Sequence, residues 1–249
     1  MSAAFHDHFS EGSRDYAAAR PTYPDELFRF IASVAPSTQR AWDCATGNGQ
    51  AARGLARHFA GVEATDASAG QIAAAPAHPR VRYSVAPAER APFAAASFDA
   101  VCVAQALHWF DVAAFHREVH RVLEPRGVFA AWAYDGMRVL AEFDAAFREV
   151  VLDRVKHLWP PQNKLLWRGY RDLPFPYEPI AAPRFQIELQ WTLAQLIGYL
   201  GTWTAVRRNI ADGHATFLVD AAEALRPAWG GDAPRRVVMP LHFICGRIS

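Results

Sequence analysis

Two hydrophobic periods alternate along the first half of the chain, and this alternation predicts strands followed by helices. An unbroken apolar run at 100–104 is typical of a strand buried on both faces of a parallel sheet. Apolar residues at helical spacing indicate amphipathic helices at 50–59 and 112–123. The chain alternates between strand and helix five times before Asp135. We therefore predict an α/β fold built on a doubly wound, mostly parallel sheet.

The pattern changes beyond Asp135, where helical stretches are separated by segments rich in aromatic residues and proline. Helices are predicted at 138–158, 192–199, 206–210 and 216–229, and strands at 185–191 and 237–248. No repeat or low-complexity linker divides the chain, so we expect a single domain over 1–249. Its expected parts are an N-terminal lid at 1–36, a cofactor-binding core at 37–135, a helical cap at 136–184 and 192–230, and C-terminal strands at 185–191 and 237–249.

The charge balance argues against two classes of partner. The 249 residues carry 26 Lys and Arg against 25 Asp and Glu, a formal net charge of +1, without a block of like charge. This balance gives no electrostatic footprint for nucleic acid or an anionic membrane, so we expect neither as a partner. The sequence also shows no apolar run near the roughly 20 residues that span a bilayer, and no signal-peptide pattern at its start.

The three cysteines all lie within predicted strands, at Cys44, Cys102 and Cys245. They are too few, and too apolar in context, to form a disulfide framework. We expect reduced core thiols, a cytoplasmic location and no metal site.

The segment 41–52 is organised as a strand, a tight glycine turn and the start of a helix. Gly47 and Gly49 can adopt positive φ and leave room for a ligand against bare backbone. The free N–H groups of the helix that follows point at whatever occupies the turn. Asp66 lies 17 residues beyond Gly49, at the end of the second strand, where a carboxylate can accept hydrogen bonds from a ribose diol. Asp66 could instead cap the helix from Ser68, but the order of elements favours a nucleoside cofactor.

The same turn also satisfies the loose dinucleotide pattern Gly-x-Gly-x-x-Ala. Asp43 argues against a dinucleotide, because a carboxylate four residues before the first glycine suits a cationic amino group or ordered water rather than a pyrophosphate. One short turn and one acid suffice for an adenosine linked to an amino acid.

The chain resembles the class I S-adenosylmethionine-dependent methyltransferases with a methyltransferase type 11 domain. The matching segments are Asp43-x-Ala45-x-Gly47-x-Gly49, Asp66, Ala88-Glu89-x-x-Pro92-Phe93 with Ser97-Phe98-Asp99, and Glu118-x-x-Arg121-Val122-Leu123-x-Pro125-x-Gly127. The Tyr-x-x-x-Arg-Pro-x-Tyr-Pro segment at 16–24 and the Ala-x-His-Trp-Phe-Asp segment at 106–111 narrow the resemblance to the trans-aconitate methyltransferase-like branch. The resemblance implies a Rossmann-like sheet of seven strands, mostly parallel with an antiparallel last strand, and a helical cap.

The resemblance further implies S-adenosylmethionine as the cofactor and assigns residues to its parts. The first acid and the turn backbone would hold the methionine moiety, the second acid the ribose, and the loop after the third strand the adenine. Residues of the N-terminal lid would fold over the cofactor, and Gln105 would lie near the sulfonium. The complete expected set is Tyr16, Arg20, Asp43, Ala45, Thr46, Gly47, Gly49, Asp66, Ala67, Ala88, Glu89 and Gln105.

Two positions depart from the family pattern. Ala45 replaces the first glycine of the motif and adds a methyl group close to the cofactor. Pro87 replaces an acid that often precedes the alanine of the adenine loop, so the adenine amino group must rely on Glu89 or on a backbone carbonyl.

The expected acceptor-site residues are His108, Trp109, Tyr134 and Trp203. His108 is the predicted general base if the acceptor is a phenol or an amine, whereas a carboxylate acceptor requires no base. For His108 and Trp109 the alternative is a packing pair that shapes the strand end. We predict methyl transfer to the oxygen of a small molecule, a carboxylate or a hydroxyl, by a monomer or a homodimer.

Two other functions remain open from the sequence. The dinucleotide pattern would suit an NAD-linked oxidoreductase, and a ligand-binding protein without catalytic activity could keep the same fold. A nucleic-acid methyltransferase is disfavoured by the balanced charge and by the lack of an Asn-Pro-Pro-Tyr-like segment after the fourth strand.

Overall fold

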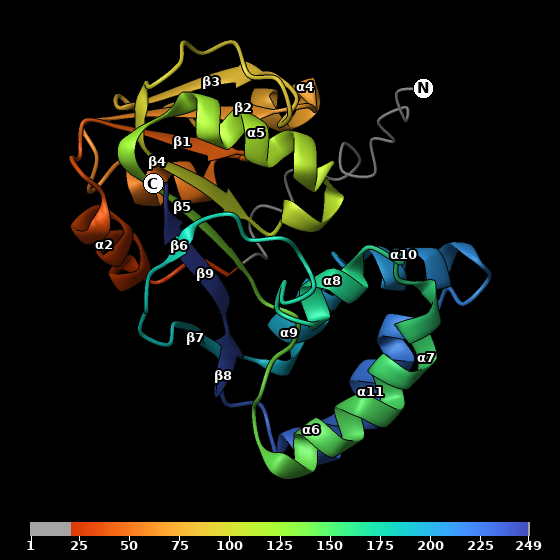
Figure 1. Cartoon of the computed structure of the whole chain (residues 1–249). Coiled ribbons are helices and arrows are strands. Elements are labelled where there is room, and N and C mark those ends of the chain that lie inside the picture. The colour runs from red at the N-terminus through yellow and green to blue at the C-terminus, as the bar shows by residue number, and fades with distance from the viewer. Residues whose placement is uncertain (1–20, 249) are drawn as a thin grey trace.

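The computed structural model describes residues 21–248, which form a sheet flanked by helices and a separate group of helices at one end of the sheet (Figure 1). The expected cofactor residues Tyr16 and Arg20 lie outside the described residues. The described part of the chain contains no helix that is long and apolar enough to cross a membrane.

The main sheet has seven strands in the order β3-β2-β1-β4-β5-β9-β6. Strands β1 to β5 pair in parallel, whereas β9 runs antiparallel to both β5 and β6. This confirms the doubly wound, mostly parallel sheet that the sequence pattern predicted and the antiparallel last strand that the family resemblance implied. The strands are β1 (Arg40–Cys44), β2 (Gly61–Asp66), β3 (Val81–Val85), β4 (Phe98–Ala104), β5 (Leu123–Ala133), β6 (Glu178–Pro179) and β9 (His242–Arg247).

Helices on both faces of this sheet begin where the sequence supplies a start signal. Pro24 precedes α2, which has acids in its first turn. The Ser68 and Asp111 side chains accept hydrogen bonds from the first-turn N–H groups of α4 and α5. These helices are α2 (Asp25–Val34), α3 (Gln50–Leu55), α4 (Ala69–Ala74) and α5 (Val112–Val122).

The core of the sheet follows the alternation of side chains along each strand. Val101 and Val103 of β4 belong to the cluster that includes Phe115 of α5. Ala100 and Cys102 belong to the opposite cluster, which includes residues of α2 and α3. The three cysteines are free and buried, as the sequence predicted.

The predicted C-terminal strand at 237–248 is wrong in one respect, because it is two strands in two different sheets. β8 (Arg235–Pro240) pairs with β7 (Gln186–Trp191) in a separate two-stranded sheet, and β9 joins the main sheet. The break has a local cause: Pro240 has no N–H for a ladder bond, and the Leu241 N–H donates to the carbonyl of Phe185. Strand β6, which had not been predicted, takes the edge position next to β9.

The predicted helix at 138–158 is instead a series of short helical segments. A π-helical stretch at Arg148–Leu152 separates α6 (Ala141–Phe147) from α7 (Asp153–Val155), and a 3-10 turn follows at Lys156–Leu158. The remaining helices of this part are α8 (Asn163–Trp167), α9 (Leu193–Leu200), α10 (Thr204–Ala211) and α11 (Phe217–Trp229).

The helical part has its own apolar cluster, which also takes in side chains from β7 and β8. Phe143 of α6, Leu196 of α9 and Trp229 of α11 are fully buried in it. Tyr134, directly after β5, belongs to the same cluster. The end of β5 is therefore continuous with the packing of the helical part, which we call the cap (residues 136–184 and 192–230).

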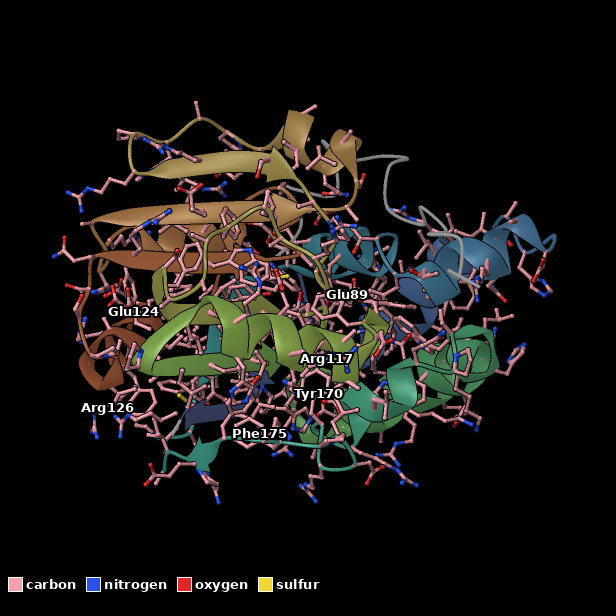
Figure 2. All side chains as sticks on the ribbon, turned by 45° about the horizontal axis from the view of Figure 1, so that its top comes forward. Glu89, Arg117, Glu124, Arg126, Tyr170 and Phe175 are labelled. Carbon is pink, nitrogen blue, oxygen red and sulfur yellow. The ribbon has the colours of Figure 1, made fainter. Side chains whose placement is uncertain are left out.

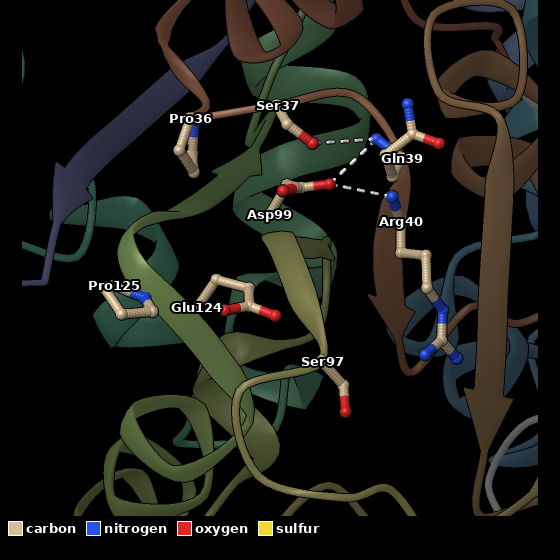
Figure 3. A pocket seen from close by; sticks show the side chains of 8 residues that line it. All are labelled: Pro36, Ser37, Gln39, Arg40, Ser97, Asp99, Glu124 and Pro125. Atoms are coloured by element: carbon tan, nitrogen blue, oxygen red, sulfur yellow. Dashed lines mark hydrogen bonds between the residues drawn. The ribbon is translucent and has the colours of Figure 1, made fainter.

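The amino ends of the strands carry a cavity of about 370 Å³ (Figure 3). Asp99 in this cavity accepts hydrogen bonds from the backbone N–H groups of Gln39 and Arg40, at 2.9 and 2.8 Å. Asp99 thereby joins the start of β4 to the start of β1. Ligands of open α/β sheets bind at the carboxyl edge instead, so this cavity lies at the edge opposite the expected site.

Candidate functional site

Asp43 lies near the carboxyl end of β1 and is completely buried. Its Oδ2 atom accepts a hydrogen bond from the Thr46 hydroxyl. Its Oδ1 atom is buried and has no hydrogen-bond partner within the part of the chain that the structure describes. Burial raises the pKa of Asp43 to about 7, against the opposing effects of the Thr46 hydroxyl and the Ala52 backbone N–H.

The turn after β1 is held in an unusual backbone conformation. Ala45, Gly47 and Gly49 have φ angles of 54°, 56° and 79°. A Cβ at Gly49 would lie 2.6 Å from Cε1 of the Tyr83 ring and closer still to its hydroxyl oxygen, so only glycine fits between the turn and β3. Ala45 is the exception, since an alanine in the left-handed region costs about 1–2 kcal/mol.

Asp66, at the end of β2, binds this turn directly. One carboxylate oxygen accepts from the Gly47 N–H at 2.8 Å, and the other accepts from the Ser68 N–H at 2.8 Å. Ser68, not Asp66, is the N-cap residue of α4. Ala67 lies between them and is exposed. The structure therefore brings the two predicted acids to the ends of neighbouring strands, and Asp66 is bonded to Gly47 of the turn that follows Asp43.

The loop after β3 carries the residues expected to face adenine. Ala88 is buried, Pro87 is exposed, and Glu89 is partly buried. Oε1 of Glu89 accepts a hydrogen bond from the Asp111 N–H at 3.0 Å, at the start of α5. Glu89 therefore has a structural contact in addition to any contact with a ligand.

Gln105 connects the ends of β4 and β5. Its side-chain Oε1 accepts from the Tyr134 N–H at 3.1 Å, and its Nε2 donates to the Tyr134 carbonyl at 3.2 Å. Gln105 also has a positive φ of 58°, which is uncommon for a residue other than glycine. This pair of bonds fixes the backbone beside the carboxyl edge of both strands.

His108 lies in a short 3-10 turn, Leu107–Trp109, and is 5% exposed. Its Nδ1 is 3.2 Å from the hydroxyl of Tyr170, which follows α8 in the cap and is labelled in Figure 2. The Trp109 ring lies 4.8 Å from the His108 ring. Burial lowers the pKa of His108 to about 4, so the imidazole is neutral at physiological pH.

The other two expected acceptor residues belong to the cap packing. Tyr134 is buried in the cap cluster. Trp203, directly before α10, is partly buried, and its ring lies 5.6 Å from Trp159 and 5.8 Å from Tyr199. Side chains from the cap thus meet both His108 and Tyr134, which follow the carboxyl ends of β4 and β5.

Sequence reasoning did not find the partners that hold these residues in place. Tyr83 fills the space beside Gly49, and Tyr170 contacts His108 from 62 residues further along the chain. Neither contact has a local signal, because each joins elements that are distant in sequence.

The polar groups at the carboxyl edge of the sheet fit S-adenosylmethionine. The buried Oδ1 of Asp43 has an unused acceptor, and a cationic amino group there would favour the ionised carboxylate. Asp66 lies at the end of the neighbouring strand β2, where a carboxylate can receive ribose hydroxyls, and its Oδ2 atom accepts the Gly47 N–H.

The comparisons with known proteins agree with this geometry. A sequence family described as a methyltransferase domain matches residues 42–131. A Dictyostelium discoideum protein, provisionally named a methyltransferase, is 30% identical over 232 residues, which cover 90% of this chain and 87% of that protein. A methyltransferase of Aspergillus terreus is 26% identical over 182 residues, which cover 63% of this chain and 54% of that protein.

One solved structure is similar over nearly the whole chain. It comes from Anaeromyxobacter dehalogenans and is provisionally named a type II methyltransferase. The two chains share 44% sequence identity and a TM-score of 0.87, with 92% of this chain and 97% of that chain covered. The chain described here therefore belongs to the class I S-adenosylmethionine-dependent methyltransferases.

Proposed function

We propose that this methyltransferase acts on a small molecule at oxygen, and that a carboxylate is the favoured acceptor. The observation that carries the proposal is His108, the predicted general base, which is buried and has a pKa lowered to about 4. An imidazole with so low a pKa is a weak base for a phenol or an ammonium group, which must lose a proton before methylation. A carboxylate is ionised at neutral pH and needs no base.

The hydrogen bonding of His108 supports the same acceptor. Its Nδ1 is engaged with the Tyr170 hydroxyl, and burial raises the pKa of Tyr170 well above its ordinary value. Tyr170 therefore stays protonated and can donate to the neutral imidazole. This pair suits packing between the cap and the end of β4 rather than proton transfer.

When bound, S-adenosylmethionine supplies a methyl group that its sulfonium already activates. Asp43 would hold the amino group, Asp66 the ribose hydroxyls, and the loop with Ala88 and Glu89 the adenine. The remaining task of the protein is to align the acceptor and to exclude water. Gln105 contributes by fixing the ends of β4 and β5 against each other.

The aromatic cap supports a small acceptor rather than a polymer. Trp159, Tyr199 and Trp203 pack together in the cap, and Tyr134 joins that cluster from the end of β5. Aromatic side chains beside the carboxyl edge of the sheet favour a small apolar or aromatic acceptor. The balanced charge also gives no electrostatic support for a nucleic-acid acceptor.

The test is a turnover assay with methyl-labelled S-adenosylmethionine and four acceptor panels. The panels are small carboxylic acids, phenols and alcohols, amines, and nucleic acid. We expect label in carboxylic acid products, released as methanol by mild alkali because methyl esters hydrolyse under those conditions. At saturating S-adenosylmethionine we also expect a rate that is level from about pH 7 to 9, because carboxylate methylation needs no general base and Asp43, whose pKa is about 7, is ionised above that pH.

Two outcomes would contradict the proposal. Alkali-stable label in amines or in nucleic acid would refute the acceptor class. Cofactor that binds but is not consumed with any panel would favour a ligand-binding protein without catalytic activity. Light scattering on the same samples tests the expected monomer or homodimer.

A further inference from the structure

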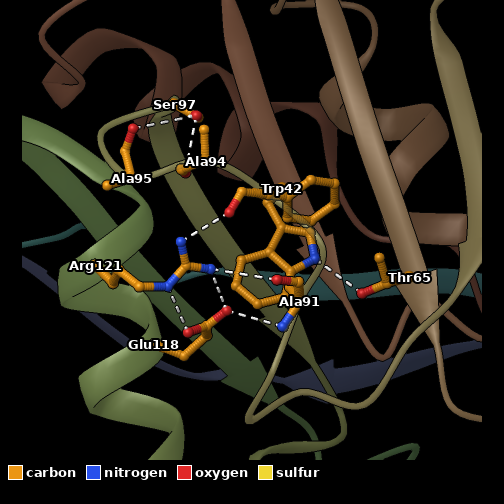
Figure 4. Close-up of polar contacts among 9 residues, drawn as sticks. Trp42, Thr65, Ala91, Ala94, Ala95, Ser97, Glu118 and Arg121 are labelled. Carbon is orange, nitrogen blue, oxygen red and sulfur yellow. Dashed lines mark hydrogen bonds and ion pairs between the residues drawn. The ribbon is translucent and has the colours of Figure 1, made fainter.

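We propose that Glu118 and Arg121 of α5 are positioning residues for adenine recognition, acting through the loop at 86–93. The inference rests on the proposed contact of Ala88 and Glu89 with adenine. The Glu118-x-x-Arg121 segment had been part of the family resemblance, but no role for it followed from the sequence. Both side chains make hydrogen bonds to the loop, Glu118 from a buried position and Arg121 from the surface, where 39% of its side chain stays exposed (Figure 4).

Arg121 holds the loop through two backbone carbonyls. Its guanidinium donates to the Phe93 carbonyl at 2.7 Å and to the Ala91 carbonyl at 3.2 Å. The same guanidinium donates to both carboxylate oxygens of Glu118, at 2.8 and 2.6 Å. An arginine is suited to this task because its planar fork offers several donors in fixed directions.

Glu118 binds the same loop by accepting a hydrogen bond from its backbone. It is 8% exposed, and its Oε1 accepts the Ala91 N–H at 2.8 Å. Burial raises the pKa of Glu118, but the hydrogen bonds from Arg121 and Ala91 outweigh it and leave the pKa below its ordinary value. Both backbone polar groups of Ala91 are therefore held by one ion pair.

The same helix also holds the other end of the loop. The backbone N–H of Asp111, the N-cap residue of α5, donates to Oε1 of Glu89 at 3.0 Å. Asp111 and Glu118 are seven residues apart, which is about 10 Å along a helix at 1.5 Å per residue. Helix α5 therefore fixes the loop at two points on either side of Arg90.

The loop needs such support because it has little internal structure. The structure describes all of its residues, and none of them lies in a helix or a strand. Pro87 and Pro92 supply no backbone N–H. At the end of the loop, the Phe93 ring packs on the Trp42 ring, with 5.6 Å between the ring centroids. Trp42 directly precedes Asp43 on β1. The Glu118–Arg121 pair thus sets the position of the loop relative to the strand that carries Asp43.

A positioning role predicts a loss of base selectivity and not only of stability. Calorimetry would measure the dissociation constants of S-adenosylhomocysteine and of S-inosylhomocysteine, in which oxygen replaces the adenine amino group. We expect Arg121→Ala to raise the dissociation constant of S-adenosylhomocysteine by roughly tenfold to hundredfold, since hydrogen bonds to charged groups order the loop. The ratio of the dissociation constant of S-inosylhomocysteine to that of S-adenosylhomocysteine should fall toward one.

Conservative variants and a matched control separate this role from general damage. Arg121→Lys keeps the positive charge but loses the several N–H donors of the guanidinium group. Glu118→Gln keeps a hydrogen-bond acceptor but loses the negative charge. Both variants should therefore show a preference for S-adenosylhomocysteine between those of the wild type and Arg121→Ala. Arg117→Ala removes an exposed arginine from the same helix and should keep the wild-type preference (Figure 2). Thermal unfolding of each variant reports whether it is folded.

Unchanged preference in Arg121→Lys and Glu118→Gln, with Arg121→Ala either unchanged or unfolded, would overturn the proposal. A wild-type protein that binds both ligands equally would overturn it as well, because the loop would then not recognise adenine. Neither result bears on the acceptor class, which the turnover assay measures on the wild-type protein.

Discussion

Replacing Asp43 by asparagine should make the free protein more stable at pH 8 and weaken its binding of cofactor. The carboxyl group is completely buried, and burial raises its pKa from an ordinary value of 3.8 to about 7. At about 1.4 kcal/mol per pKa unit, this difference corresponds to about 4 kcal/mol of unfolding free energy. Above pH 7 the folded state carries that cost in full, because the ionised carboxylate is more stable in the unfolded chain.

The sign of the pH dependence follows from proton binding. Between pH 4 and pH 7 the folded state binds the proton that the unfolded state has lost, so this group makes the protein less stable as the pH rises. The asparagine variant has no such titration at this position. Its amide would leave an N–H at the position of the unpartnered Oδ1, at a cost of about 1–3 kcal/mol. The variant should therefore be about 1–3 kcal/mol more stable than the wild type at pH 8. Near pH 4 it should be less stable by about 1–3 kcal/mol, because the wild-type carboxyl group is then protonated in the folded state and only the cost of the amide N–H remains.

Urea unfolding followed by tryptophan fluorescence, from pH 4.5 to 8.5, measures this difference between Asp43→Asn and the wild type. Calorimetry at pH 8 should show S-adenosylhomocysteine bound about tenfold to hundredfold more weakly by the variant, because a charged hydrogen bond to the amino group is lost. Asp99→Asn, a buried acid at the amino edge, is the control and should leave this affinity unchanged. Equal pH slopes and equal affinities for Asp43→Asn and wild type would refute the reasoning.

Two further predictions concern the turn and the strand end. Gly49→Ala should lower the free energy of unfolding in urea by about 2–4 kcal/mol, because its Cβ would overlap the Tyr83 side chain and its φ is 79°. The double variant with Tyr83→Ala should recover part of this loss. A single variant as stable as the wild type would contradict the prediction. His108→Gln should remove an acid sensitivity of about 3 kcal/mol between pH 6.5 and pH 4, because burial lowers the pKa of His108 from 6.5 to about 4 and the unfolded state then binds the extra proton. If the free energies of unfolding of the variant and the wild type change equally with pH across that range, His108 does not titrate as a buried group.

The first five strands could be predicted because their signals are local. Strand β4 is a continuous apolar run, the shorter strands lie between turn residues and helical segments, and the acids Asp43 and Asp66 mark the ends of β1 and β2. Once these strands pair in parallel, their carboxyl ends meet at one edge, so the sequence order alone brings the two acids together. The hydrogen bond between Asp66 and Gly47 then depends on the turn conformation that the glycines permit.

The two-sheet arrangement at the end of the chain could not be predicted in the same way. Residues 237–248 are apolar almost throughout, so their periodicity does not show that β8 and β9 face different partners. Pro240 was a signal for the break, but a proline near a strand start is also compatible with an edge strand. The choice depends on Phe185 and β7, which are some fifty residues away in sequence.

The contacts that hold the site were also beyond a local pattern. Arg121 reaches Phe93 across 28 residues, and His108 meets Tyr170 across 62. Helical spacing could place Glu118 and Arg121 on α5, but their surroundings decide whether they face solvent or a loop. The interruption of the predicted helix at 138–158 by a π-helical stretch likewise has no distinct pattern of residues.

The position of β9 has a consequence for how the chain folds. β9 lies inside the sheet, between β5 and β6, although it is made after every other strand that the structure describes. Until residues 242–247 leave the ribosome, one edge of β5 has unpaired backbone groups beside the apolar side chains of Val128 to Ala133. An open apolar strand edge is a template for pairing between chains. We therefore expect nascent or truncated chains without β9 to aggregate or to require a chaperone, even though they contain every residue assigned to the cofactor.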